Sequence, residues 1–155
     1  MGARHQLTKD ERKFVERMRV ARLATADARG IPHAVPVCYA FDGHRFYTPL
    51  DEKSKRVPDA AMKRVRNIAE NSAVAFLVDR YDDDWSQLAY VLVQGQAELI
   101  DAGREGHADA VALLRARYPQ YREMHLEIRP VIAIRPERVV SWGLLVESDQ
   151  SGSRL

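Results

Sequence analysis

A basic stretch after a strand-like run is the part of the sequence with the clearest chemical meaning. The run "FYTP" ends at Pro49, and "DEKSKR" follows it with Lys53, Ser54, Lys55 and Arg56. These residues place a hydroxyl between two ammonium groups, ahead of a predicted helix. Such a strand-to-helix junction suits a phosphate, because backbone N–H groups at the helix start also point toward an anion. No glycine-rich P-loop pattern is present, so a nucleoside triphosphate site is not indicated.

Further cations continue this stretch into the predicted helix, namely Lys63, Arg64 and Arg66. A solvated helix face explains these three at least as well as a binding site does. The formal net charge of the chain is only +2, which is too small to argue for a nucleic-acid partner. The sequence therefore indicates a local anion site.

Cysteine and histidine give little indication of direct catalysis. The single cysteine, Cys38, excludes an internal disulfide and lies among apolar residues of a predicted strand, where a thiol is usually inert packing. The histidines are scattered without metal-ligand spacing, so neither a zinc site nor a catalytic triad is indicated. Two of them, His5 and His107, are predicted to be solvated. The five are His5, His33, His44, His107 and His125.

The loop "YDDDWSQ" (Tyr81 to Gln87) carries three consecutive carboxylates and a tryptophan. A solvated loop is favoured over a cation site, because three adjacent loop carboxylates rarely converge without further ligands. Trp85 has a large apolar face to bury. It is therefore predicted to cover a pocket or a partner chain.

Composition and length define the setting for these residues. The 155 residues, 46% hydrophobic and 30% charged, are typical of one soluble globular domain. The sequence contains no run of about 18 apolar residues, so no transmembrane helix is predicted. The polar N-terminal residues show no signal-peptide pattern. A cytoplasmic protein is expected.

Three helices are predicted. Thr8 and Glu11 form a capping box at the start of the first. The second is expected from about Pro58 to Glu70, because proline suits a first turn and apolar residues follow at helical spacing. The third is expected from about Arg104 to Tyr118.

The remaining segments alternate like strands. Residues 32–41 have two largely apolar faces, so this strand is predicted to be covered on both sides. The pair Asp42–Gly43 then predicts a hairpin. Residues 73–80 form a short apolar strand, and residues 88–100 a long one with a bulge or bend at Gly95.

The last strand-like segment, residues 131–142, is expected to form two short strands interrupted by Pro136. About six strands and three helices are predicted in all. Hairpins without regular βαβ alternation indicate an antiparallel sheet or barrel, mainly β, with helices added.

Four segments in this order resemble a known family: "RVARLATAD" (residues 19–27), "GIPHAVPVCYAFDGHRFYT" (residues 30–48), "NIAENSAVAFLVD" (residues 67–79) and "IRPERVVSWG" (residues 134–143). No single motif is specific, but the ordered set resembles the pyridoxamine 5′-phosphate oxidase-like flavin-binding split barrels over nearly the whole chain. It is most similar to the actinobacterial branch that uses the deazaflavin coenzyme F420.

The resemblance implies a six-stranded antiparallel split β-barrel in a single domain, residues 1–155. This domain has an N-terminal helix in residues 1–18, the barrel with its inserted helices in residues 19–143 and a polar tail in residues 144–155. The resemblance also implies a homodimer with two cofactor sites in grooves between the protomers. The matching flavin-contacting residues are His33, Ala34, Val35, Pro36 and Val37. The matching phosphate-binding residues are Tyr47, Thr48, Lys53, Ser54 and Lys55.

The sequence departs from the pyridoxamine phosphate oxidases proper at two places. Those enzymes have an Arg-Lys pair where this chain has Ser54 and Lys55. They also carry an Arg- and His-rich substrate-binding segment after the last strand, whereas this chain ends in "LLVESDQSGSRL". These departures argue against vitamin B6 oxidation.

Charge distinguishes the cofactors. Flavin mononucleotide (FMN) has one phosphate, which two lysines and a hydroxyl satisfy, whereas coenzyme F420 adds an oligoglutamate tail that needs a longer basic track. Arg56, with Lys63, Arg64 and Arg66, would supply this track. The leading hypothesis is an F420-dependent oxidoreductase that transfers hydride to a small unsaturated organic substrate, with the cofactor supplying the chemistry. The alternatives are an FMN-dependent oxidase or reductase, and a non-catalytic cofactor- or haem-binding protein with His33 or His44 as axial ligand.

Overall fold

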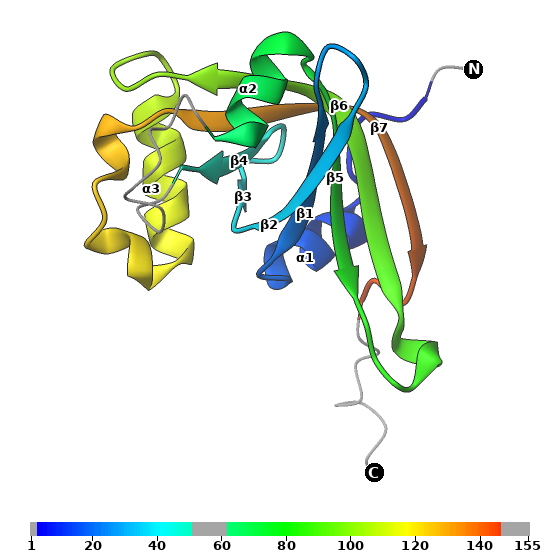
Figure 1. Cartoon of the computed structure of the whole chain (residues 1–155). Coiled ribbons are helices and arrows are strands. Elements are labelled where there is room, and N and C mark those ends of the chain that lie inside the picture. Colours follow the sequence, from blue (N-terminus) through cyan, green and yellow to red (C-terminus); the bar gives the residue numbers. More distant parts are fainter. Residues whose placement is uncertain (1–2, 51–61, 147–155) are drawn as a thin grey trace.

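The chain forms a strongly curled sheet with helices around it (Figure 1). The computed structural model describes residues 3–50 and 62–146. In this part of the chain the helices are α1 (Lys9–Arg17), α2 (Lys63–Glu70) and α3 (His107–Arg117), with the short 3-10 turns η3 (Trp85–Gln87), η4 (Pro119–Arg122) and η5 (Leu126–Ile128). The strands are β1 (Ala21–Ala26), β2 (Pro32–Val37), β3 (Ala40–Phe41), β4 (Phe46–Pro49), β5 (Ala73–Arg80), β6 (Ala89–Ile100) and β7 (Val131–Gly143).

The strands of the described residues make one antiparallel sheet in the order β2-β1-β5-β6-β7-β4-β3. The two end strands, β2 and β3, follow each other in the sequence with only Cys38 and Tyr39 between them. The sheet therefore curls until its two ends meet at a short connection instead of a hydrogen-bonded pair. This is a split barrel, and it confirms the predicted fold class.

The division into strands differs from the prediction. Residues 32–41 are not one strand, because the chain leaves β2 at Val37 and starts β3 at Ala40. Residues 131–143 are one continuous strand, so the expected interruption at Pro136 is wrong. These two differences cancel in number, and the described residues contain seven strands where about six were predicted.

A β-bulge explains why Pro136 does not break β7. The pairing passes from Gln94 opposite Arg138 to Gly95 opposite Pro136, which leaves Glu137 as the extra residue of β7. The predicted irregularity at Gly95 is confirmed. Gly95 is required there, since a Cβ atom would lie 2.1 Å from the carbonyl oxygen of Arg135.

Strand β2 is an edge strand, and the expectation that it is covered on both sides is wrong for the single chain. Ala34 and Pro36 on one face are exposed, whereas Val37 on the other is buried. Proline has no N–H to donate, so Pro32 and Pro36 suit the edge of the sheet. The apolar pattern of the sequence predicts burial but does not say whether the same chain provides it.

The start of α1 agrees with the prediction, whereas that of α2 differs from it. The capping box at α1 is confirmed, with the backbone N–H of Glu11 donating to Thr8 Oγ1 at 3.2 Å and that of Thr8 donating to Glu11 Oε1 at 2.8 Å. Helix α2 starts at Lys63, because Met62 has extended backbone angles. The predicted start near Pro58 is therefore too early, and residues 58–61 lie outside the described residues.

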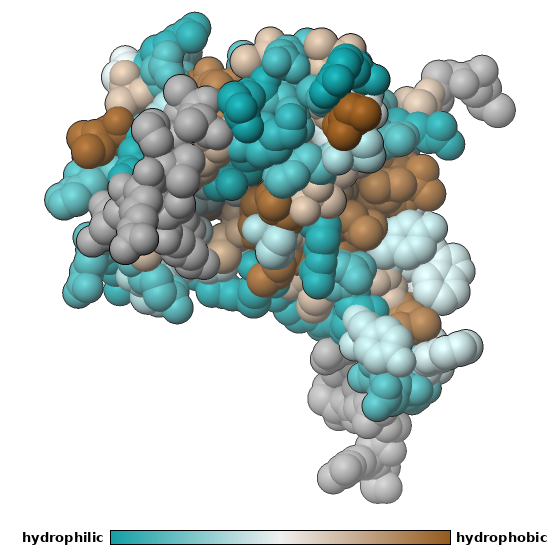
Figure 2. Space-filling view, in the orientation of Figure 1, coloured by the Kyte–Doolittle hydropathy of each residue, from teal (hydrophilic) through white to brown (hydrophobic). Residues whose placement is uncertain are grey.

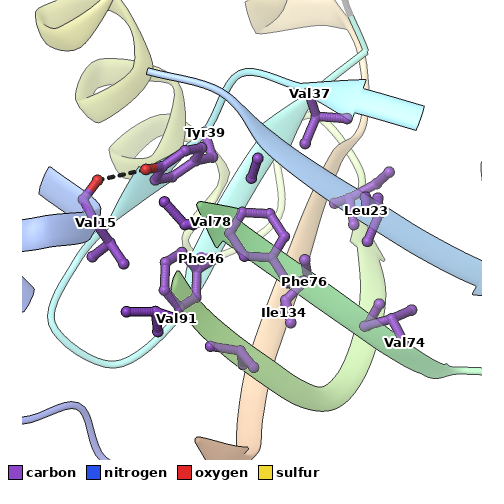
Figure 3. Close-up of a cluster of buried hydrophobic side chains, with 14 of the residues drawn as sticks. Val15, Leu23, Val37, Tyr39, Phe46, Val74, Phe76, Val78, Val91 and Ile134 are labelled. Atoms are coloured by element: carbon purple, nitrogen blue, oxygen red, sulfur yellow. Dashed lines mark hydrogen bonds between the residues drawn. The ribbon is translucent and has the colours of Figure 1, made fainter. Parts of the chain in front are cut away.

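The main hydrophobic core fills the inside of the curl (Figure 3). Phe76 packs against Phe46 with ring centroids 4.7 Å apart and against Tyr39 edge-on at 5.3 Å. Helix α1 closes one end of the curl with Val15, which is fully buried, and the Tyr39 hydroxyl donates to the Val15 carbonyl at 2.6 Å. Fully burying such side chains contributes about 1.5–3 kcal/mol each, so this core fixes the sheet that surrounds the site.

Candidate functional site

A cavity of about 390 Å³ lies where the barrel is split, between the end of β2, the end of β4 and the start of α2. It is mainly apolar, with a few polar side chains at one side. Its lining residues are Val20, Val35, Pro36, Val37, Cys38, Thr48, Pro49, Met62, Arg64 and Tyr121. Pockets of this size and composition are typical of small-molecule and cofactor sites.

Strand β2 supplies the apolar wall of the cavity. Val35, Pro36 and Val37 are consecutive, and all three line the cavity because it lies at the end of the strand and at its free edge. Val37 is buried and anchors the strand to the core, while Pro36 is exposed. The backbone here is held by β1 on one side only among the described residues, so the other side faces the cavity region.

Thr48 brings a polar group to the opposite side of the cavity. The residue is 1% exposed, and its Oγ1 atom has no hydrogen-bond partner among the described residues. An unsatisfied buried hydroxyl costs about 1–3 kcal/mol. Natural proteins rarely keep such a cost without a compensating function, so a ligand that accepts or donates a hydrogen bond here would remove it.

The start of α2 adds positive charge to the same region. Arg64 is half-buried and lines the cavity next to Met62. Met62 is the N-cap residue without a side-chain cap hydrogen bond, and the first turn contains no acidic residue. The first backbone N–H groups of a helix and its dipole favour an anion. Together with Arg64, they make this end of the cavity suitable for a phosphate.

The other two cations of α2 do not line the cavity. Arg66 is exposed, and the Nζ atom of Lys63 lies 4.0 Å from a carboxylate oxygen of Asp27. Exposed pairs of this kind contribute about 0–1 kcal/mol. These two side chains therefore extend the positive region outward from the cavity instead of forming its wall.

The structure brings together four of the predicted site residues, namely Val35, Pro36, Val37 and Thr48. The predicted phosphate ligands Lys53, Ser54, Lys55 and Arg56 lie outside the described residues. These residues connect the end of β4 to Met62 in the sequence, and Pro49 and Met62 both line the cavity.

Tyr47 and His33 are not among the residues that line this cavity. Tyr47 neighbours Thr48 on β4, so it points to the other face of the sheet, where its hydroxyl donates to Asp42 Oδ2 at 2.7 Å. Burial, and then the hydrogen bond to Asp42, raise the pKa of Tyr47 to about 12. His33 is half-buried at the far end of β2, opposite Thr25 of β1.

Trp85 lies at the tip of the long β5–β6 hairpin, far from α2 and β4 (Figure 1). Its residue is 71% exposed, so within the described chain it covers no pocket. The carboxylates of the same loop are exposed, and Asp84 Oδ1 accepts the Ser86 N–H at 3.0 Å. The prediction of a solvated loop is confirmed, and the described residues contain no group of three or more side chains that could hold a metal ion.

The sequence did not reveal several residues of the site, and it predicted the wrong solvent exposure for one histidine. Cys38 lies between β2 and β3 instead of within a strand, is half-buried and lines the cavity. Met62 and Tyr121 also line it, and only the fold brings them there. His107 is 3% exposed, with its Nε2 atom 2.6 Å from the carbonyl oxygen of Arg129, so the prediction that it is solvated is wrong.

A second cavity of about 590 Å³ lies between the β3–β4 hairpin, β6 and the start of α3. Some of its charged groups already have partners: Arg45 Nη1 lies 3.3 Å from Glu98 Oε1, and Asp42 Oδ2 accepts a hydrogen bond from the Tyr47 hydroxyl. Its lining is mainly polar, whereas that of the cavity at the split is mainly apolar.

Comparison with known proteins identifies the family. Residues 7–143 match the family model of pyridoxamine 5′-phosphate oxidase. The chain therefore belongs to the pyridoxamine 5′-phosphate oxidase family and is related to the oxidoreductases of this class. This confirms the resemblance found in the sequence.

One characterised relative is a 5a,11a-dehydrotetracycline/5a,11a-dehydrooxytetracycline reductase from Streptomyces rimosus subsp. rimosus. It is 29% identical over 145 residues, which cover 93% of this chain and 87% of the relative. The match thus extends over nearly the whole of both chains.

Two solved structures share the fold. The haem storage protein HutZ from Vibrio cholerae superimposes with a TM-score of 0.69 at 14% identity, covering 91% of this chain and 99% of HutZ. A structure described as an F420 reductase superimposes with a TM-score of 0.60 at 22% identity, covering 86% of this chain and 98% of that protein. At these identities the likeness shows the fold alone.

No helix among residues 3–50 and 62–146 is both long and apolar enough to span a membrane.

Proposed function

We propose that this protein is a reductase that binds a phosphorylated deazaflavin, coenzyme F420, in the cavity at the split and reduces a small unsaturated organic substrate. The observation that carries the proposal is the meeting of three features in one cavity. These are the apolar wall of β2, the buried Thr48 hydroxyl without a partner and the positive start of α2. A flat apolar ring joined to a phosphate would complement these features, with the ring against the apolar wall and the phosphate near Thr48 and the start of α2.

The residues present fit such a group. Val35 and Val37 offer aliphatic contacts to the face of a ring, and the free edge of β2 offers backbone polar groups to its rim. The Thr48 hydroxyl would donate to a phosphate oxygen, and Arg64 would pair with its charge. Lys53, Ser54 and Lys55 are proposed to add further phosphate contacts, because they lie in the segment that joins β4 to α2.

When bound, a deazaflavin supplies hydride transfer, which requires no acid or base of its own from the protein. The chain would contribute position and exclusion of water. The β2 wall would fix the ring, and Met62 and Tyr121 would shield the side of the cavity away from the substrate. Holding the reacting atoms in one geometry is itself a large part of catalysis.

The charge distribution favours F420 over FMN. Arg66 is exposed beyond the cavity, and Arg56 is proposed to continue the basic track. The oligoglutamate tail of F420 would follow this track, whereas FMN has nothing to place there. The name of the reductase relative from Streptomyces also supports a reduction, and that of the F420 reductase structure supports a deazaflavin as the cofactor.

We further propose that the protein is a homodimer. Leu77, Leu92 and Val140 form a row of half-buried side chains across the outer face of β5, β6 and β7, and Trp142 beside them is 55% exposed. Figure 2 shows residues of high and intermediate hydropathy gathered along this part of the sheet. A second copy would cover this face, and Trp85 would then reach a neighbouring chain. Sedimentation equilibrium at micromolar concentration tests this, and a monomer that binds cofactor contradicts it.

Equilibrium binding of F420 and of FMN, followed by fluorescence quenching, tests the cofactor assignment directly. F420 should bind more tightly at low salt, and its advantage should shrink as salt screens exposed pairs beyond about 8 Å. Equal or tighter binding of FMN at every salt concentration would make the protein an FMN enzyme of the same fold.

Haem binding is a second candidate, because two possible axial ligands, Cys38 and Tyr121, line the cavity. The histidines expected for this role are less well placed: His33 does not line the cavity, and His44 is exposed in the β3–β4 turn. Titration with ferric haem separates the two functions, since a thiolate or phenolate ligand gives a distinctive Soret band that Cys38→Ser or Tyr121→Phe abolishes.

A further inference from the structure

We propose that Cys38 is a modification site that forms a mixed disulfide with small, negatively charged disulfides, and that this adduct and the cofactor exclude each other. The part of the proposal that concerns the cofactor rests on the proposed function. The modification itself rests on the position of the thiol.

The position of Cys38 distinguishes it from an ordinary core cysteine. A fully buried thiol in apolar surroundings is usually inert, but Cys38 is half-buried and lines the cavity at the split. It is the single cysteine of the chain. No other thiol of the same chain can therefore form a disulfide with it, and a modifying reagent meets no competition.

A second observation shows that this cavity is arranged for a ligand. The Oγ1 atom of Thr48, another residue that lines this cavity, is buried without a partner among the described residues. A space that accommodates a polar ligand next to Thr48 also admits a small disulfide, because Cys38 and Thr48 line one continuous cavity of about 390 Å³.

The backbone on both sides of Cys38 is fixed, so an adduct has to extend into the cavity. Val37 pairs with Ala21 at the end of the β1–β2 ladder. Tyr39 is fully buried, and its N–H donates to the Tyr118 hydroxyl at 3.1 Å. Because neither neighbour can shift without losing these contacts, the added group would occupy the space that the cofactor needs.

The chemistry is a thiol–disulfide exchange. The Cys38 thiolate attacks one sulfur of a disulfide R–S–S–R, a new bond forms between Sγ and that sulfur, and the original S–S bond breaks. The leaving thiolate takes the electron pair of the broken bond and then the proton that Cys38 lost. The products are the protein mixed disulfide and one equivalent of R–SH, so the oxidant is the small disulfide itself.

Charge selects among such reagents. Arg64 lines the same cavity as Cys38 and brings a positive charge to it. A disulfide with carboxylates, such as 5,5′-dithiobis(2-nitrobenzoate) (DTNB), should therefore react faster than the cationic disulfide cystamine. The ratio of the two rates, each divided by the rate of the same reagent with a free thiol, should fall as salt rises.

The test is DTNB labelling of the native protein with and without F420, with release of thionitrobenzoate as the readout. We expect one equivalent per chain and, with F420 at ten times its dissociation constant, a labelling rate about tenfold lower. Labelled protein should bind F420 at least tenfold more weakly, and dithiothreitol should restore binding. The Cys38→Ser variant should bind F420 with the same affinity before and after DTNB treatment.

The outcomes separate the modification from the proposed function. Native protein that binds F420 but does not react with DTNB, or that labels at the same rate with F420 bound, overturns the inference and leaves the proposed function standing. Native protein that binds neither F420 nor FMN overturns the proposed function, and the exclusion between cofactor and adduct falls with it. Equal normalised rates for DTNB and cystamine overturn the charge selection.

Discussion

Thr48→Val should stabilise the cofactor-free protein and weaken cofactor binding at the same time. Valine keeps the branched shape of threonine and its preference for a strand, so the change replaces only the hydroxyl with a methyl group. Thr48 Oγ1 is buried without a partner among the described residues. Removing this unsatisfied hydroxyl should therefore raise the free energy of unfolding by about 1 kcal/mol, and by no more than about 3 kcal/mol.

Thr25→Val is the matched control. Thr25 is also a buried strand threonine, 3% exposed, but its Oγ1 atom accepts a hydrogen bond from Asn67 Nδ2 at 3.0 Å. Asn67 is itself 1% exposed, so Thr25→Val leaves a buried donor unsatisfied. This variant should lose about 1–3 kcal/mol of stability. Urea unfolding of both variants should thus move the midpoint in opposite directions.

The two variants should also differ in binding. A hydrogen bond to a charged phosphate contributes about 1.5–3 kcal/mol, which corresponds to a loss of roughly 10- to 150-fold in affinity for Thr48→Val. Thr25→Val should keep its affinity, because Thr25 does not line the cavity. Fluorescence titration with F420 and with FMN measures both. If Thr48→Val is destabilised as much as Thr25→Val, or binds both cofactors as tightly as the native protein, Thr48 is not a ligand contact.

Three further predictions concern the rest of the chain. Burial alone would raise the pKa of Glu11, but hydrogen bonds from the neighbouring groups, above all from Arg4, hold it at about 2. Since this pKa is below the unfolded value near 4.5, the contribution of Glu11, roughly 3 kcal/mol, is present above pH 4.5 and is lost as pH falls toward 2. Urea midpoints measured against pH should therefore fall less steeply for Glu11→Gln than for the native protein in this range. Gly95→Ala should be destabilised by more than about 3 kcal/mol or fail to fold, because the added Cβ atom would meet the backbone of β7 at 2.1 Å; soluble expression and thermal unfolding measure this. Joint replacement of Lys63 and Arg66 by Gln should weaken F420 binding by about 0.4–2 kcal/mol at low salt and leave FMN binding nearly unchanged; equal effects on both cofactors in the same titration would contradict the tail contact.

Local patterns predict most of the elements because they depend on neighbours in the sequence. The capping box at Thr8, the hairpin at Asp42–Gly43 and the bulge at Gly95 are each determined by a few adjacent residues, and the structure confirms all three. The sequence around Pro136 predicts a break in the strand, because the residue that allows a proline there lies on another strand. Gly95, across the ladder, lets β7 bulge there, and a proline within a bulge interrupts no strand.

The site was predicted less completely because its residues depend on which face and which edge the fold gives them. Alternation predicts that Tyr47 and Thr48 point to opposite faces, but it does not say which face meets a cavity. The two apolar faces of β2 indicated burial, yet the sheet order puts this strand at an edge. Met62, Arg64 and Tyr121 join the cavity from segments far apart in the sequence, and no local signal marks Met62 or Tyr121.

The cavity exists because of how the chain crosses the split. Two residues, Cys38 and Tyr39, join the ends of the sheet, and β2 and β3 do not pair with each other in the described part of the chain. Tyr39 is held inside the core, where its hydroxyl donates to the carbonyls of Val15 at 2.6 Å and Met18 at 3.1 Å and its ring lies under the guanidinium of Arg117. Tyr39 is thus fixed in the core directly after Cys38, which lines one cavity together with Thr48. The split therefore leaves a cavity, and the buried Thr48 is one of the residues that line it.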